Sequence, residues 1–196
     1  MKYEAHSLGE MLRKVAIDYV RYGYYRYLLA EMPREKDAKV IDHKLLTLYK
    51  ITYCRTRRAR QRAKGEAVVA YVRFGHRFIL LATEGDHTEI EKQNFKDCRV
   101  QPIHLSGYTI GVKNTKPCVQ LSQKRYRALR KLLSRIALHN KTKLTDFFNR
   151  ISPFSFPGIL RQKYKLLKMV NTKRKKAGLT SLNFFDDLEN VPISKT

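Results

Sequence analysis

The clearest hydrophobic pattern in the chain lies over residues 67–83, where two short apolar runs flank a two-residue turn. The runs, 67–74 and 77–83, are rich in valine, isoleucine, leucine and aromatic residues, which is typical of β-strands. Gly75 and His76 separate them, and glycine at the first turn position favours a type II′ turn between antiparallel strands. Because both runs are nearly continuous in apolar residues, each face of this hairpin should be covered, one of them by a helix.

Helical spacing dominates the chain before the hairpin. Apolar residues recur every three or four positions over 8–31, with Ser7 available as an N-cap, and predict one long helix. The same spacing over 37–50 predicts a second helix, which Asp37 can cap. Residues 55–64 suit a third helix, either continuous with the second or restarted after it. That helix would be polar nearly all round, and such a helix is marginal without a partner.

Extended segments and then helices follow the hairpin. Three apolar segments predict further strands that join the hairpin in one antiparallel sheet. Three helices are predicted after them, the first capped by Ser122 and the last stopped by Gly178. The expected strands cover residues 98–105, 107–112 and 118–121, and the expected helices cover residues 123–140, 144–151 and 158–177.

The order of these elements predicts an α+β fold. It contains an antiparallel sheet of four to five strands built on the central hairpin (67–83). With 196 residues, one domain is expected. We therefore expect a single basic α+β domain over residues 1–182, with N-terminal helices over 8–64, the sheet over 66–121 and C-terminal helices over 123–177, followed by an acidic tail over residues 183–196.

The charge of the chain predicts a polyanionic partner. It has 41 Lys and Arg residues against 17 Asp and Glu, a net charge of +24, and its pI is about 10.2. Self-repulsion at this level opposes folding, and a polyanion would relieve it. Nucleic acid is the expected partner, because its regularly spaced phosphates release counterions when Lys and Arg neutralise them. A solvated basic surface and a surface that docks an acidic protein are the alternatives.

Three segments hold the cations expected to contact phosphates. In the first, six cations occur within ten residues without an acid, and helical spacing divides them between two sides. The other two segments lie on predicted C-terminal helices, where a folded backbone fixes the cations in space. The candidate phosphate-binding residues are Arg55, Arg57, Arg58, Arg60, Arg62 and Lys64 in the first segment, Lys124, Arg127, Arg130, Lys131 and Arg135 in the second, and Arg161, Lys165, Lys168, Lys173 and Arg174 in the third.

Tyrosines interleaved with arginines over residues 19–27 suggest base stacking. Five phenols occur there in nine residues, and Tyr22 and Tyr25 are the candidate stacking residues beside Arg21 and Arg26. This supply of aromatic rings slightly favours RNA or single strands over duplex DNA. For most of these tyrosines we favour the alternative, that they cover the edge of the core with their hydroxyls in water, and we expect stacking only from those that project beside Arg21 or Arg26.

One acidic cluster follows the hairpin and is the candidate catalytic region. His87 beside Asp86 suits acid–base chemistry near neutral pH, and Glu84, Asp86 and Asp97 are carboxylates that a metal-dependent nuclease could use. A nuclease or strand-transfer enzyme is therefore the alternative to a binding module. The spacing matches no recognised metal motif, so no metal site is expected, and we favour a structural role in which Asp86 or Thr88 caps the next helix.

The cysteines and the apolar content bear on location. Cys54, Cys98 and Cys118 are an odd number without metal-binding or disulfide spacing, so we expect free thiols in the cytoplasm. No run reaches the roughly 18 apolar residues of a membrane span. We therefore expect a cytoplasmic protein that needs no cofactor and no membrane, and that acts as an accessory subunit beside other proteins of a nucleoprotein complex.

Overall fold

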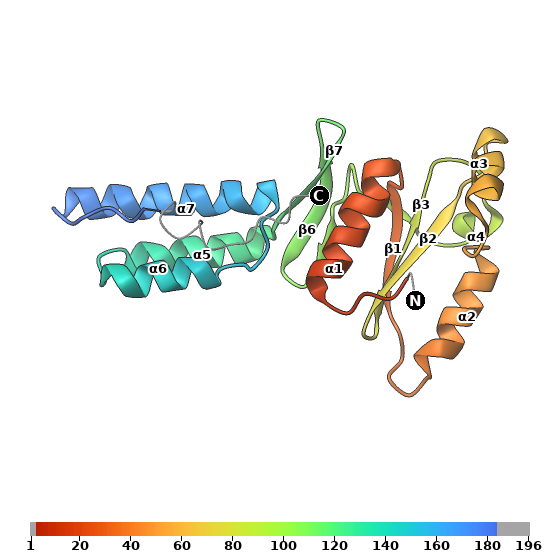
Figure 1. Ribbon diagram of the computed structural model, residues 1–196, viewed down its shortest axis with the longest axis horizontal. Helices are drawn as coiled ribbons and strands as arrows, with labels where there is room; N and C mark the ends of the chain where they lie inside the picture. The colour runs from red at the N-terminus through yellow and green to blue at the C-terminus, as the bar shows by residue number, and fades with distance from the viewer. Residues whose placement is uncertain (1–2, 184–196) are drawn as a thin grey trace. The chain divides into compact units, whose positions relative to one another are not determined.

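The computed structural model describes residues 3–183, which form seven α-helices and two antiparallel β-sheets (Figure 1). The α+β fold class expected from the sequence is confirmed. The chain divides into two compact units, Met1–Val119 and Gln120–Thr196. Their union in a single domain over residues 1–182 stays a prediction, and all of the expected acidic tail except Asn183 lies outside the described residues.

A four-stranded antiparallel sheet forms the centre of the first unit. The predicted hairpin is confirmed, because its two strands pair in a register that leaves only Gly75 and His76 in the turn. Gly75 has φ +58°, a value that glycine adopts readily and that a type II′ turn requires at this position. The strands lie in the order β2 (Val69–Phe74), β3 (Arg77–Ala82), β1 (Arg26–Glu31) and β4 (Lys96–Asp97).

Helices cover both faces of this sheet (Figure 1), whereas the apolar strands predicted cover on both faces and a helix on one of them. Successive side chains of a strand point to opposite faces, so Tyr71 and Leu80 share one face while their neighbours point to the other. On the first face they join a core with α2 (Ala38–Leu48) and the short helix α4 (Thr88–Glu91). The second face packs against α1 (Leu8–Arg13) and the helical turns that continue it.

The N-terminal helix is shorter than expected, and the prediction of one helix over 8–31 is wrong in its second half. α1 continues as a π-helix over Lys14–Tyr19 and a 3₁₀ turn over Val20–Tyr22. Gly23 then ends the helix with φ +86°, a left-handed conformation open to glycine. The chain next becomes β1, which pairs with β3 on one side and β4 on the other. Its apolar spacing fits a helix and a strand alike, and the pairing decides between them.

The N-terminal segment protects the outer edge of β2. The Ala5 N–H donates to the carbonyl of Arg73 at 2.7 Å, and the Arg73 N–H donates to the carbonyl of Tyr3 at 2.9 Å. An unpaired strand edge is a template for association with other chains. This short pairing therefore covers β2 on the side away from β3.

The strands that follow the first sheet form a second antiparallel sheet. The first sheet has four strands, within the expected range, but the segments over 103–121 are not among them. A strand's partners depend on long-range packing that its own apolar pattern does not encode, which is why the sequence prediction placed these segments in one sheet with the hairpin. The second sheet has the order β5 (Ile103–Leu105), β6 (Tyr108–Lys113) and β7 (Lys116–Leu121).

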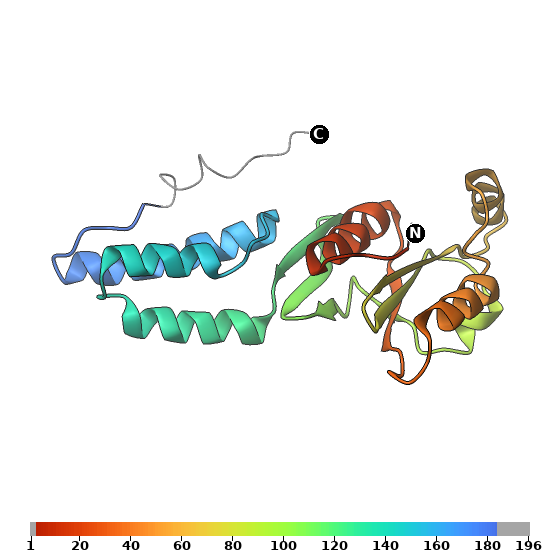
Figure 2. The same cartoon turned by 60° about the horizontal axis from the view of Figure 1, so that its bottom comes forward.

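Three helices run side by side in the second unit (Figure 2). They are α5 (Gln123–Ile136), α6 (Lys141–Arg150) and α7 (Pro157–Lys176), and α5 packs against α7. The Ser122 hydroxyl accepts a hydrogen bond from the N–H of the third residue of α5 at 3.3 Å. Gly178 follows α7 with φ +70°. Both predicted helix ends are therefore confirmed.

Candidate nucleic-acid interface

The helix α3 (Arg55–Ala63) has no buried residue, and it projects from the rest of the first unit (Figure 2). It contains five of the six cations predicted in this segment, and Lys64 follows it as the C-cap. Within residues 3–183, none of the six forms a salt bridge. The helix is polar all round, as the sequence indicates, and its charges are not neutralised by acids of the described chain.

One side of α3 contacts a tyrosine of the first unit and lies near a second. The guanidinium of Arg62 is 5.0 Å from the centre of the Tyr24 ring, within the range of a cation–π contact. Burial raises the pKa of Tyr19, and the nearby charge of Arg58 acts in the opposite direction. The contact of Arg62 with the Tyr24 ring therefore helps to hold α3 against the rest of the first unit.

A second side of α3 lines a groove with a volume of about 640 Å³. Arg57, Arg60 and Lys64 are spaced by three and four residues, which places them on the same side of the helix. The guanidinium of Arg57 lies 3.6 Å from the centre of the Tyr53 ring. This α3 groove is lined by Lys50, Tyr53, Cys54, Thr56, Arg57, Arg60, Gln61, Lys64 and Glu66, so four cations face a single acid.

Lys50 and Tyr53 add to the candidate interface two residues that were not predicted from the sequence. Both lie in the turn between α2 and α3. Lys50 has φ +53°, a left-handed conformation that is uncommon for a residue other than glycine, and both side chains line the groove. The position of an aromatic residue directly before the arginine run is the sequence signal that could have identified Tyr53.

The two predicted stacking residues differ in how open their rings are. Tyr22 is 62 % exposed at the end of the first helical segment. Tyr25 is only half-buried, but the guanidinium of Arg99 lies 4.6 Å from its ring centre and covers one side. Tyr24 and Tyr27 are buried and belong to the core. Of the tyrosines predicted to stack, Tyr22 is therefore the more open to a base.

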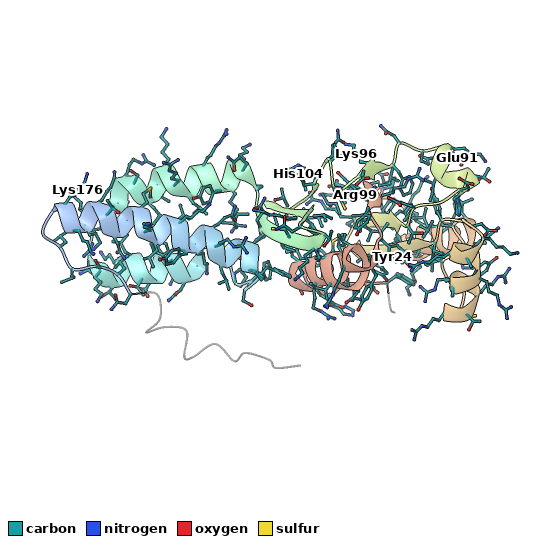
Figure 3. The ribbon with its side chains drawn as sticks, turned by 90° about the horizontal axis from the view of Figure 1, so that it is seen from above. Tyr24, Glu91, Lys96, Arg99, His104 and Lys176 are labelled. Carbon is teal, nitrogen blue, oxygen red and sulfur yellow. The ribbon has the colours of Figure 1, made fainter. Side chains whose placement is uncertain are left out.

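Arg99, which is labelled in Figure 3, also binds two of the candidate catalytic carboxylates. Its Nη1 lies 2.7 Å from the carboxylate of Glu84, and its Nη2 lies 2.6 Å from the carboxylate of Asp97. The hydrogen bond from Arg99 lowers the pKa of Asp97, and the same pairing raises the pKa of Arg99. These carboxylates therefore neutralise an arginine of the fold.

The imidazole of His87 caps α4. Its Nδ1 accepts a hydrogen bond from the N–H of Glu89 at 3.2 Å. Burial, with the charge of Lys50 as a second cause, lowers the pKa of His87, so the uncharged ring that this bond requires is favoured. The predicted capped helix is present, but His87 is the cap in place of Asp86 or Thr88. Asp86 and His87 instead line a hollow of about 340 Å³ together with Lys50, Gln61, Glu66, Thr88 and Glu91.

The part of the chain that the structure describes, residues 3–183, also bears on metal ligands, paired cysteines and membrane spans. No group of three or more His, Cys, Asp or Glu side chains is arranged to hold a metal ion. The three cysteines are free, with Cys54 exposed and Cys98 buried, and burial raises the pKa of the Cys98 thiol to about 11. No helix of this part of the chain has the length and apolar character of a membrane span.

The second unit has seventeen Lys and Arg against one acid, Asp146, over residues 120–183. Four of these cations, Arg125, Lys163, Lys173 and Arg174, donate to backbone carbonyls. The other thirteen are all exposed, and none forms a salt bridge within the described chain. They are Lys124, Arg127, Arg130, Lys131, Arg135, Lys141, Lys143, Arg150, Arg161, Lys165, Lys168, Lys175 and Lys176, the last at the end of α7 (Figure 3).

Four of these exposed cations form a stripe along α5. Lys124, Arg127, Lys131 and Arg135 are spaced by three and four residues and therefore lie on one side of the helix. Leu133, the buried residue of α5, lies on the opposite side. The packing of α5 thus turns this stripe, which we call the α5 stripe, toward solvent.

Arg174 differs from the sequence prediction, because it is buried and only 3 % exposed. Its guanidinium donates three hydrogen bonds that hold the end of the helical unit together. A guanidinium whose donors are used by the backbone has few left for a phosphate, so Arg174 is not part of the candidate interface. Lys173 also donates to Ser134, but it remains exposed. The partners of Arg174 are the carbonyls of Ala137, His139 and Thr180, at 3.1, 2.8 and 2.7 Å.

Comparisons of this chain with protein-family models, with curated proteins and with solved structures found no match.

Proposed function

We propose that this protein binds nucleic acid through the phosphate backbone, using the α3 groove of the first unit and the exposed cations of the second. The observation that supports this is the lack of acid partners for these cations within residues 3–183. In the first unit, by contrast, acids pair with Arg73, Arg77 and Arg99 away from α3. The excess charge is thus concentrated on particular helices.

A polyanion accounts for this arrangement better than solvent does. Cations held on folded helices keep a fixed spacing and can contact successive phosphates, with release of counterions. The α3 groove adds an amide, a hydroxyl and the Tyr53 ring to its cations, and aromatic rings beside cations are typical of surfaces that bind single strands. RNA or single-stranded DNA is therefore the preferred ligand of the proposal.

We also propose where the protein acts and with which partners. We place it in the cytoplasm, where free thiols such as the exposed Cys54 are usual. An accessory role in a nucleoprotein complex follows from a surface suited to binding, and it brings protein subunits as further partners. The role of the basic surface in that complex is to position the nucleic acid.

The test is the salt dependence of binding to a short fluorescein-labelled single strand, followed by anisotropy from about 50 to 200 mM NaCl. Arg57→Ala combined with Arg60→Ala removes two cations from the α3 groove. The plot of log affinity against log salt has a negative slope, and each lost phosphate contact makes that slope less steep by about 0.7 on a single strand. The double variant should therefore have a slope that is less steep by about 1.4. It should fold as the unmodified protein does, since both side chains are exposed.

The matched control is Lys39→Ala combined with Lys44→Ala. Both lysines are exposed on α2 and neither lines the α3 groove, so the same charge is removed from a neighbouring helix. The slope should stay as in the unmodified protein. If both double variants reduced the steepness of the slope equally, the attraction would be diffuse and there would be no interface at α3. If the protein bound no nucleic acid at low salt, the proposed function would be wrong. Association that survives nuclease treatment in a pull-down would indicate an acidic protein as the partner.

A further inference from the structure

A second groove lies along α7 in the second unit, at a place that the sequence does not indicate. After Gly178 the chain turns back along α7, and Asn171 holds the returning segment. Its Nδ2 donates to the carbonyl of Leu182, and its Oδ1 accepts from the Leu182 N–H, both at 2.8 Å. The bond from Arg174 to the carbonyl of Thr180 fixes the same segment. A defined chain segment therefore forms one wall beside the helix.

The α7 groove between this segment and the helix has a volume of about 350 Å³. Its walls combine two lysines, an aromatic ring and several hydroxyl and amide groups, with one leucine. Tyr164 is 57 % exposed, an unusually open position for a large aromatic side chain. The groove is lined by Tyr164, Leu167, Lys168, Asn171, Thr172, Lys175 and Ser181.

Tyr164, Lys168 and Lys175 lie on the same side of α7. Their spacings of four and seven residues bring the side chains into one line, with the two cations about 6 and 16 Å along the axis from the ring. Arg161, one turn before Tyr164, is exposed on the same side. An aromatic ring is thus followed and preceded by cations along one line of the helix.

The side chains of these three residues form no polar contact with the described part of the chain. Within residues 3–183, no hydrogen bond or ion pair is formed by the side chains of Tyr164, Lys168 or Lys175. The buried side of α7 is formed by other residues, among them Leu166 and Val170. Packing therefore does not account for an open ring between cations, whereas a ligand with both a flat apolar face and negative charge would.

We propose that the α7 groove binds one nucleotide of a single strand, with the base stacked on Tyr164 and the adjoining phosphates on Lys168 and Lys175. Both faces of a base in a duplex are covered by its neighbours, so only an unpaired strand can offer a base to the ring without base flipping. Thr172 and Ser181 supply hydroxyls at the groove for the edge of the base or the sugar. This inference rests on the proposed function and names the strandedness of its ligand.

The chain contains no tryptophan, so Tyr164→Trp introduces a single reporter at the groove. A base stacked on the indole quenches its emission. We expect quenching by a short oligo-thymidine or oligo-uridine strand, reversal by salt, and no quenching by a duplex of the same length bound under the same conditions. Anisotropy of the labelled nucleic acid, recorded on the same samples, reports whether binding occurs.

A set of substitutions separates the ring from its surroundings. Tyr164→Ala should weaken single-strand binding by between about 5-fold and 140-fold, the range that the loss of one stacked base implies, while Tyr164→Phe keeps the ring and should bind as the unmodified protein does. Leu138→Ala is the matched control, because Leu138 is 54 % exposed in the same unit and outside the groove. It should leave affinity unchanged.

The outcomes distinguish this inference from the function on which it rests. If the indole emission of the Tyr164→Trp variant stays unchanged while anisotropy reports a bound single strand, the α7 site is overturned and the proposed function still stands. The α7 site is also overturned, and the proposed function still stands, if Tyr164→Ala binds the single strand with unchanged affinity or if a duplex quenches the indole emission as strongly as the single strand does. If anisotropy reports no binding of any nucleic acid by the unmodified protein at low salt, the proposed function itself fails.

Discussion

Burial and a neighbouring cation keep the imidazole of His87 uncharged near neutral pH. The Nδ1 of the ring needs its lone pair to accept the bond from the Glu89 N–H, and protonation would remove that acceptor. Burial is the larger cause of the lowered pKa of His87 and Lys50 the second, while Glu89 and Glu66 act in the opposite direction. The local charges thus favour the cap over a role in proton transfer.

The lowered pKa of His87 predicts a loss of stability in mild acid. An unfolded histidine takes up a proton below about pH 6.5, whereas the folded His87 does so only at lower pH. The unfolded chain therefore binds more protons in this window, and stability falls as the pH drops from neutrality through the folded pKa. His87→Asn keeps an N-cap side chain that does not titrate. Denaturant unfolding at pH 7 and pH 5 should show a smaller loss for His87→Asn than for the unmodified protein.

Equal pH dependence in the two proteins would contradict this role of His87. The comparison at neutral pH is the internal control, because both side chains can cap α4 there and the two stabilities should be similar. A large loss already at pH 7 would indicate that the ring packing of His87 on Tyr49, whose ring centres are 5.8 Å apart, matters more than the cap.

At the scale of elements, a buried ionic cluster joins α2 to the sheet. Asp42, 2 % exposed on α2, accepts a hydrogen bond from the Tyr71 hydroxyl at 2.5 Å and another from Arg73 Nε at 3.1 Å. Arg73 also donates to Glu4 at 2.7 Å. Burial is the first cause of the raised pKa of Tyr71, and Asp42 is the second. The cluster thus ties a helix, an edge strand and the N-terminal segment together.

Breaking this cluster should cost more than removing a helix cap. Asp42→Ala leaves the buried Arg73 with one carboxylate and Tyr71 without an acceptor, and we expect it to lower the free energy of unfolding by about 3 to 5 kcal/mol. Asp37→Ala, on the same helix, removes the side chain that accepts from the Lys39 N–H at 2.9 Å, and should cost about 1 kcal/mol. Urea unfolding of the two variants measures both values. Similar losses would mean that the cluster does not hold α2 in place.

At the scale of the whole molecule, the uncompensated charge should make stability depend on salt. The net charge of +24 repels itself in the folded state more than in the expanded unfolded chain. Salt screens that repulsion, so the melting temperature should rise as NaCl increases from about 50 to 200 mM. Chloride is preferred to sulfate in this measurement, because sulfate also strengthens apolar burial. A melting temperature that stays constant or falls over this range would show that repulsion among the cations does not destabilise the folded state.

Local signals were sufficient for much of the fold. The hairpin follows from its apolar runs and from Gly75, and the ends of α5 and α7 follow from Ser122 and Gly178, because turns and caps depend on residues that are neighbours in the chain. The same is true of α3, whose spacing placed Arg57, Arg60 and Lys64 on one side. The existence of these elements could therefore be predicted without knowledge of their partners.

Other features depend on contacts between distant residues. Residues 26–31 have an apolar pattern that suits a helix or a strand, and they are a strand because β3 and β4 flank them. The burial of Arg174 requires α5 and the segment after α7 to come together around it. Tyr164 looks in the sequence like any other aromatic residue of a helix, and only its exposure marks it.

The amino-acid sequence by itself determined the composition of the protein's surface: an excess of cations, their periodic placement on helices, and the local turns and caps that set where those helices begin and end. Tertiary structure decided which of these cations remain available. It assigned acids to Arg73 and Arg99 and backbone carbonyls to Arg174, while within residues 3–183 it gave Arg57 and Arg60 no acid partner. The physical reason is that the state of a charge depends on every group within a few ångströms of it, and those groups are brought together only when the chain folds.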